Sequence, residues 1–295
     1  MRVKARGKIN WTLDIVGIRE DGYHLLDSLM QSVELYDMLA FERADELTLQ
    51  VKGPMRVTAD EGNLVLRAMR LLTTRLNITE GCQITLTKRI PIGAGMGGGS
   101  ADAAATLAGL NRFWRLSLKE SELMSLALEL GADVPFCLTG GLQRAKGIGE
   151  QLERLPVNRP AYLVIVQPCW GLPTPEMYQN YDADTKGLPP PHRPDNDRAV
   201  YAARAGMLPR MCSAMGNVLQ SVAIQKRPEI AQAIQALEHF GAIRAQMTGS
   251  GSAVFGVFAS AWSAQYAWER IVPIWRRCWM TRTASRGLVF REWLN

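Results

Sequence analysis

The sequence predicts a fold of mixed α-helices and β-strands organised in two halves. Three observations predict it: short runs in which apolar and polar residues alternate, longer runs with helical periodicity between them, and a break in composition at residues 155–160. The chain has 295 residues, which is long enough for two hydrophobic cores. We therefore expect one domain over residues 1–156 and a second over residues 157–295.

Five segments show the features of β-strands. In residues 8–16, KINWTLDIV, apolar and polar residues alternate, which predicts a half-buried strand with Lys8 and Asn10 on one face. The other predicted strands are rich in β-branched or aromatic residues and are bounded by turn residues. They are residues 47–51, 84–90, 162–166 and 253–258.

Four segments show helical periodicity, at residues 64–72, 104–114, 123–130 and 228–240. The spacing of Ser117 and Glu120 predicts a capping box before the third helix. Pro228 lies inside the start of the fourth and Gly241 just past its end. The proline-rich residues 187–197 predict a loop.

The composition is that of a globular protein. Hydrophobic residues make up 47% and charged residues 21%, which excludes a largely disordered chain. No apolar run reaches the roughly 18–20 residues of a membrane span, and the N-terminus lacks the apolar block of a signal peptide, so we expect a cytoplasmic protein without a membrane partner. Five scattered cysteines and three histidines predict neither a disulfide framework nor a zinc site.

The most distinctive segment is PIGAGMGGGS, residues 91–100, between a predicted strand and an alanine-rich helix. Glycine loses the most backbone freedom on ordering, so such a loop is useful where backbone amides must approach a ligand closely. Successive N–H groups that end at a helix N-terminus form a site for phosphate oxygens. The loop therefore predicts phosphate binding.

The kind of phosphate ligand needs more context. Gly93, Gly95 and Gly98 satisfy G-x-G-x-x-G, which dinucleotide enzymes and protein kinases share. A dinucleotide fold needs a strand with a terminal acidic residue soon after the helix, whereas a second helix follows here. The H-R-D and D-F-G strings of protein kinases and the Walker pattern are absent.

Two further glycine clusters, residues 131–149 and 248–256, indicate that several loops converge on one anionic ligand. Asp133 lies in the otherwise apolar segment GADVPF, where an unpaired carboxylate is costly to bury. We therefore expect Asp133 to have a cationic partner or a catalytic task.

The segments KIN, PIGAGMGGGSADAA, GADVPF and MTGSGSAVF together resemble the GHMP kinases, the superfamily named for galactokinase, homoserine kinase, mevalonate kinase and phosphomevalonate kinase. Within it, DGYHLLDSLMQSVELYD, NLVLRAMRLL, GADVPFCLTGG and GIGE are most similar to the kinases of the non-mevalonate isoprenoid pathway that act on a cytidine diphosphate derivative of methylerythritol. The resemblance implies a two-lobed α+β small-molecule kinase with its active site between the lobes. ATP would be the phosphoryl donor and the 2-hydroxyl of the methylerythritol unit the acceptor.

The resemblance also implies roles for single residues. Lys8 and Asp133 would form the catalytic pair, in which a carboxylate accepts the proton of the alcohol and an ammonium orients that carboxylate. Mg²⁺ is expected beside ATP, with Ser100 as its candidate ligand. The implied ATP-binding residues are Pro91, Ile92, Gly93, Ala94, Gly95, Met96, Gly97, Gly98, Gly99, Ser100, Ala101, Asn63 and Lys88. The implied substrate-binding residues are Asn10, Tyr23, His24, Thr174, Tyr178, Gly249 and Ser250.

Alternatives remain open at this stage. A homoserine or mevalonate kinase would share the loops, although it does not explain the DGYH segment. A dinucleotide oxidoreductase would bind NAD, and a nucleic-acid-binding module would show salt-dependent retention. The net charge of +6 is better explained by two anionic ligands, so we expect a small-molecule substrate, no nucleic acid, and a monomer or weak homodimer. Trp11, Val218 and Gln220 depart from the family pattern. Of the properties that the resemblance implies, the substrate preference is the one that these differences affect most.

Overall fold

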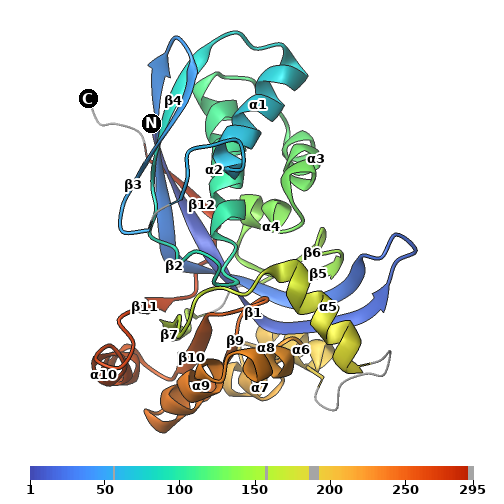
Figure 1. Cartoon of the computed structure of the whole chain (residues 1–295), viewed down its shortest axis with the longest axis vertical. Coiled ribbons are helices and arrows are strands. Elements are labelled where there is room, and N and C mark those ends of the chain that lie inside the picture. The colour runs from blue at the N-terminus through green and yellow to red at the C-terminus, as the bar shows by residue number, and fades with distance from the viewer. Residues whose placement is uncertain (56, 157–158, 186–192, 292–295) are drawn as a thin grey trace.

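The computed structural model describes residues 1–55, 57–156, 159–185 and 193–291. Two lobes lie one above the other in Figure 1, each built on its own sheet. The strands are β1 (Arg2–Ile18), β2 (His24–Ala44), β3 (Leu47–Lys52), β4 (Gly81–Thr87), β5 (Leu142–Gly147), β6 (Gln151–Leu155), β7 (Tyr162–Val166), β8 (Gly216–Asn217), β9 (Arg244–Met247), β10 (Val254–Phe258), β11 (Cys278–Arg282) and β12 (Leu288–Arg291). The helices are α1 (Leu64–Leu76), α2 (Gly98–Phe113), α3 (Glu120–Leu130), α4 (Val134–Thr139), α5 (Thr174–Thr185), α6 (Asn196–Arg204), α7 (Leu208–Ser213), α8 (Gln220–Lys226), α9 (Glu229–His239) and α10 (Ala261–Ile271).

The larger sheet has the strand order β12-β1-β2-β4-β3, with β5 paired to β2, β6 to β5 and β8 to β1. Its pairs are antiparallel except β3 with β4 and β1 with β8. The smaller sheet has the antiparallel order β11-β7-β10-β9. Because β12 pairs with β1, the last described strand returns from the lower lobe to the larger sheet.

Helices α1 to α4 cover one face of the larger sheet in the upper lobe (Figure 1). Helix α2 lies at the centre of this layer, and its alanines at 101 and 103–105 are fully buried. Such small side chains let the helix axis come close to the strands, against core residues such as Phe41 and Ile84. The position of α2 matters because its first residues are the end of the glycine loop.

All five predicted strands are confirmed, although their bounds shift by a few residues, as in β4, which ends at Thr87. The expectation of a half-buried strand at residues 8–16 was wrong, because every residue from Lys8 to Ile15 is buried. The polar side chains of this strand face a cleft and the second lobe instead of bulk solvent. Alternation in a sequence cannot distinguish these two environments.

The four predicted helices correspond to α1, α2, α3 and α9. The predicted cap at Ser117 was wrong: Ser117 has a φ of 58° and lies outside the helix, which begins only at Glu120. Asn196 and Asp197, predicted in a loop, open helix α6, because Asp195 caps it by accepting a hydrogen bond of 3.0 Å from the Arg198 amide. Residues 187–192 of that loop, and 157–158 of the predicted break, lie outside the described residues.

None of the described helices has the length and apolar character needed to cross a membrane.

Candidate active site

A cleft of about 1120 Å³ lies where the two lobes meet. The glycine loop and Asp133 line it from the upper lobe, the β1–β2 hairpin forms one wall, and α5 and residues 249–251 close it from the lower lobe. Every predicted site residue except Ala101 lines this cleft. The side chain of Ala101 is buried in the core, and its amide donates to the Gly97 carbonyl at 2.8 Å within α2. Its assignment to ATP binding stays a prediction.

The glycine loop ends as the N-terminus of α2. Gly97 is the N-cap residue and has a φ of 65°, a left-handed conformation that favours glycine. It has no side chain with which to cap the amides of residues 98–100, the first groups of the helix that lack an intrahelical acceptor. These amides and the positive end of the helix dipole form a site for an anion.

The loop at residues 248–251 packs directly against the glycine loop. At Gly95, whose φ is 69°, an added Cβ would lie only 2.1 Å from the Thr248 carbonyl oxygen. Backbone hydrogen bonds of 3.3 Å join Ser252 N to Gly93 O and Ala253 N to Ala94 O. Two of the glycine clusters thus meet in space, as the sequence predicts.

Lys8 and Asp133 meet beside Gly97. The Lys8 ammonium lies 3.4 Å from Asp133 Oδ2 and donates to Asn10 Oδ1 at 2.8 Å. The Lys8 side chain is only 5% exposed, whereas that of Asp133 is 37% exposed. The Lys8 amide donates to the Met96 carbonyl at 2.9 Å, which fixes the strand to the glycine loop. The Asp133 carboxylate is therefore accessible to a ligand in the cleft, and the buried Lys8 ammonium pairs with it on the protein side.

Lys88 lies beneath the first turn of α2. Its ammonium contacts Asp37 Oδ2 at 2.5 Å and Asp102 Oδ2 at 2.6 Å, and all three side chains are buried. Burial opposes the positive charge, but the two carboxylates outweigh it and raise the pKa of Lys88. Burial also raises the pKa of Asp102 well above its usual range, more than Lys88 lowers it. A Cβ at Gly98 would lie 3.0 Å from the ammonium, so Lys88 supports the loop from directly below.

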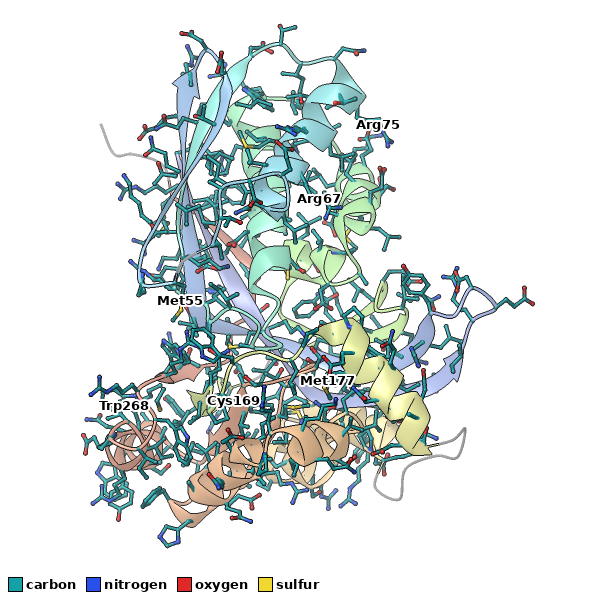
Figure 2. All side chains as sticks on the ribbon, viewed as in Figure 1. Met55, Arg67, Arg75, Cys169, Met177 and Trp268 are labelled. Carbon is teal, nitrogen blue, oxygen red and sulfur yellow. The ribbon has the colours of Figure 1, made fainter. Side chains whose placement is uncertain are left out.

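Helix α5 carries the aromatic wall of the cleft. Met177, labelled in Figure 2, and Tyr181 pack into the core of the lower lobe, and the next residues, Tyr178 and Asp182, line the cleft. The ring of His24 lies on Tyr178, with centroids 4.8 Å apart, and its Nε2 contacts Asp182 Oδ1 at 2.8 Å. Burial and the nearby Asp133 charge raise the pKa of Tyr178, which keeps it a neutral phenol.

The remaining predicted residues lie around this wall. Tyr23 lies at the tip of the hairpin, is 61% exposed and lines the cleft. The hydroxyl groups of Thr174 and Ser250 are 2.8 Å apart, which joins the start of α5 to the 248–251 loop. Asn63 caps helix α1 by accepting a bond of 3.0 Å from the Val65 amide.

Several residues that shape the site were missed from the sequence. Thr248 Oγ1 accepts a bond of 3.0 Å from the Asn10 amide, and Ser28 Oγ accepts one of 2.8 Å from Asn10 Nδ2. Thr248 stands at the start of a glycine cluster that was noted, and Ser28, Asp37 and Asp102 lie within segments that resemble the family. Neither these segments nor the residues around Asp182 show which side chains they contact. Their partners lie from 14 to 158 residues away along the chain, so only the fold brings them together.

The three departures from the family pattern do not line the cleft. Trp11 is buried with its ring edge-on to Phe255, and Val218 is buried in the core of the lower lobe. The Gln220 side chain accepts a bond of 2.8 Å from the Met247 amide, next to the 248–251 loop. Their roles in the structure are packing and support of that loop.

The cleft suits a metal ion that arrives with a ligand. No group of three or more acidic, histidine or cysteine side chains in the described part of the chain is arranged to hold a metal. Mg²⁺, however, usually keeps several waters and is bound by one or two protein oxygens together with substrate phosphates. The Ser100 hydroxyl, which lines the cleft at the start of α2, is an oxygen of that kind.

Comparison with known proteins agrees with this geometry. Residues 63–141 match the GHMP kinases N terminal domain and residues 199–272 match the GHMP kinases C terminal domain. A homoserine kinase from Cytophaga hutchinsonii, 18% identical, shares the fold with a TM-score of 0.74 over 98% of this chain and 96% of its own. The two lobes, the glycine loop and the cleft between them define a GHMP kinase.

Closer relatives specify the group within that class. Curated proteins named 4-diphosphocytidyl-2-C-methyl-D-erythritol kinase are 35% identical in Alkaliphilus metalliredigens, over 99% of this chain and 98% of theirs, and 41% identical in Pelotomaculum thermopropionicum, over 96% and 98%. A crystal structure of 4-(cytidine 5'-diphospho)-2C-methyl-D-erythritol kinase, 32% identical, has a TM-score of 0.81 over 96% of this chain and 99% of its own. The chain belongs to the 4-diphosphocytidyl-2-C-methyl-D-erythritol kinase family.

Proposed function

We propose that this protein transfers the γ-phosphoryl group of ATP to the 2-hydroxyl of 4-diphosphocytidyl-2-C-methyl-D-erythritol, a step of the non-mevalonate pathway of isoprenoid biosynthesis. The observation that carries the proposal is the place of the Lys8–Asp133 pair, which lies between an anion site at the start of α2 and an aromatic wall on α5 within one cleft. Membership of the family supports the choice of acceptor.

Phosphoryl transfer then follows from the arrangement of these groups. Asp133 accepts the proton of the acceptor hydroxyl, whose oxygen forms a bond to the γ-phosphorus while the bond to the β,γ-bridging oxygen breaks and ADP leaves. Lys8, fixed by Asn10, keeps the carboxylate oriented and offsets its charge beside the triphosphate. The amides of residues 98–100 receive the phosphate oxygens.

The two ends of the cleft would hold different parts of the ligands. Residues 91–100, with Asn63 and Lys88 on the same side, form the ATP half, in which Lys88 acts through the loop above it. His24, Tyr178 and Tyr23 offer ring faces for the cytosine, and Asn10, Thr174, Gly249 and Ser250 are polar groups along the path to Asp133.

Four further features belong to the proposal. Mg²⁺ would be held by Ser100 and the triphosphate oxygens, where it neutralises charge on the transferred group. The protein would act as a monomer or weak homodimer in the cytoplasm. The division into domains of residues 1–156 and 157–295 remains a prediction, with β12 crossing back to the first sheet.

The test is ADP release with ATP and Mg²⁺, measured in parallel for 4-diphosphocytidyl-2-C-methyl-D-erythritol, homoserine and mevalonate. We expect turnover of the cytidine compound alone. Lys8→Ala and Asp133→Asn should remove it, with melting profiles that show folded protein. Turnover of homoserine or mevalonate instead would keep the ATP half of the cleft and overturn the substrate half.

A further inference from the structure

Two aspartates stand directly opposite each other on the hairpin that forms one wall of the cleft. Asp14 on β1 pairs in register with Asp27 on β2, and their side chains are only 7% and 13% exposed. Like charges placed opposite each other across two strands are destabilising, and little solvent is present here to screen them. The hairpin therefore needs cations from elsewhere in the fold.

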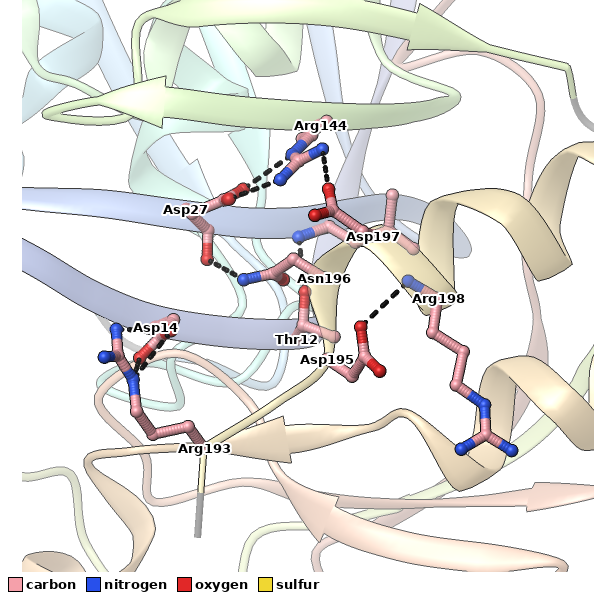
Figure 3. A network of polar contacts seen from close by, with 10 residues as sticks. Thr12, Asp14, Asp27, Arg144, Arg193, Asp195, Asn196, Asp197 and Arg198 are labelled. Atoms are coloured by element: carbon pink, nitrogen blue, oxygen red, sulfur yellow. Dashed lines mark hydrogen bonds and ion pairs between the residues drawn. The ribbon is translucent and has the colours of Figure 1, made fainter. Parts of the chain in front are cut away.

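Two arginines from separate segments supply them, as Figure 3 shows. Arg193, in the segment before α6, donates hydrogen bonds to the Asp14 carboxylate from Nε at 3.0 Å and from Nη2 at 2.7 Å. Arg144, on β5, donates hydrogen bonds to the Asp27 carboxylate from Nε at 2.8 Å and from Nη2 at 2.6 Å. Its Nη1 donates to Asp197 Oδ1 at 2.7 Å. Both arginines make bidentate contacts with a carboxylate, which fix the orientation of the two side chains as well as the distance between them. We refer to Asp14, Asp27, Arg144 and Arg193 as the arginine clamp.

The clamp lies on the face of the hairpin that points away from the cleft. Successive side chains of a strand point to opposite faces, and Leu26 and Ser28, on either side of Asp27, line the cleft. Ser28 in turn accepts the hydrogen bond from Asn10, the residue that holds the Lys8 ammonium. Asp27 is thus linked to the catalytic pair through its neighbour Ser28 and through Asn10.

We propose that Arg144 and Arg193 are positioning residues for the acceptor substrate. They hold the hairpin so that its cleft-facing side, and its tip at Tyr23 and His24, lie opposite α5 across the cleft. The role toward the acceptor rests on the proposed function; the mechanical role does not. Neither arginine lines the cleft, so each acts through the hairpin. The ATP half of the cleft is built on residues 91–100 and the start of α2, which join β1 at the Lys8 amide, six residues before Asp14. We therefore expect it to depend little on the clamp.

The experiment compares Arg144→Met with Arg154→Met as a matched control. Arg154 also pairs with a carboxylate, Glu120, at 2.6 Å, but both side chains are more than 60% exposed. Arg154 lies on β6, which pairs with β5 and not with the hairpin. In Arg144→Met we expect KM for the acceptor to rise about tenfold while KM for ATP stays within about twofold. Amide hydrogen exchange over residues 19–28 should also be faster than in the control.

A double variant separates positioning from simple loss of stability. Arg144→Met alone leaves the Asp27 carboxylate buried and unpaired, whereas Arg144→Met with Asp27→Asn removes that charge. We expect the double variant to recover acceptor KM and hairpin exchange toward the wild-type values. Unchanged acceptor KM and control-like exchange in Arg144→Met, even with a lower melting temperature, would overturn the clamp. If the wild-type protein does not turn over the acceptor, the proposed function fails, and the exchange comparison still decides whether the clamp holds the hairpin.

Discussion

The close approach of the two glycine loops predicts a large effect of one added methyl group. In Gly95→Ala the new Cβ would lie 2.1 Å from the Thr248 carbonyl oxygen and 3.0 Å from the Gly251 amide nitrogen, and both neighbours are backbone atoms. A flexible side chain could rotate aside, but backbone cannot. The 248–251 loop must therefore move away from the glycine loop by more than 1 Å to restore ordinary contact, which begins near 3.4 Å.

The magnitude follows from two contributions. An alanine at a φ of 69° costs about 1–2 kcal/mol, because its Cβ crowds the following carbonyl in a left-handed conformation. Separation of the loops also breaks the two backbone bonds from Ser252 and Ala253, each worth about 0.5–1.5 kcal/mol. We expect Gly95→Ala to lower the free energy of unfolding by about 2–5 kcal/mol.

Gly241→Ala is the matched control, because Gly241 has a φ of 94° and no atom within 4 Å of an added Cβ. It should lose only the conformational part, about 1–2 kcal/mol. Urea denaturation of both variants measures the difference, and KM for ATP measures whether the loop has moved. Equal losses of stability in the two variants, with an unchanged KM for ATP, would refute the view that the loops are packed against each other.

Three further predictions concern the cleft and the thiols. Asp133→Asn should lower kcat by about 10²–10⁴-fold with a nearly unchanged melting temperature, and a large fall in melting temperature instead would show a structural role. Tyr178→Ala should raise KM for the cytidine substrate by about tenfold or more, as expected for loss of one stacking face, whereas Tyr178→Phe should stay within about threefold in the same kinetic assay. Burial raises the pKa of the Cys82 thiol to about 12. The folded state therefore keeps a proton that the unfolded chain loses above about pH 8.5. The free energy of unfolding should fall as the pH rises above about 8.5. Half-buried Cys169 should then be alkylated before the four buried cysteines, and mass spectrometry that finds Cys82 modified first in the folded protein would contradict this.

The sequence predicted the glycine loop and the need of Asp133 for a cation because those signals are local or chemical. Five glycines in a short run require a close approach of backbone, and a carboxylate in an apolar segment requires a partner. The strand at residues 8–16 was also predictable, since alternation is a local pattern. The burial of every residue from Lys8 to Ile15 was not, because polar residues of this strand line a cleft that exists only when both lobes are present.

The elements missed from the sequence depend on distant contacts. Strand β2 is 21 residues long and was not predicted, and its register with β1 shifts three times, so no single period runs through the pair. Helix α5 has only two buried side chains, Met177 and Tyr181, which is too few for a clear helical pattern. Asp37 and Asp102 meet Lys88 from 51 and 14 residues away, and no pattern in the sequence links them.

The position of the new phosphate ester tests the central claim most directly. After incubation of the wild-type protein with ATP, Mg²⁺ and 4-diphosphocytidyl-2-C-methyl-D-erythritol, the product is examined by ³¹P and ¹³C nuclear magnetic resonance. The account predicts one new monoester phosphorus that is coupled to carbon 2 of the methylerythritol unit, and at least about 10²-fold less of it in the same time with Asp133→Asn. A phosphate at another hydroxyl, or hydrolysis of ATP with the acceptor unchanged, would contradict it.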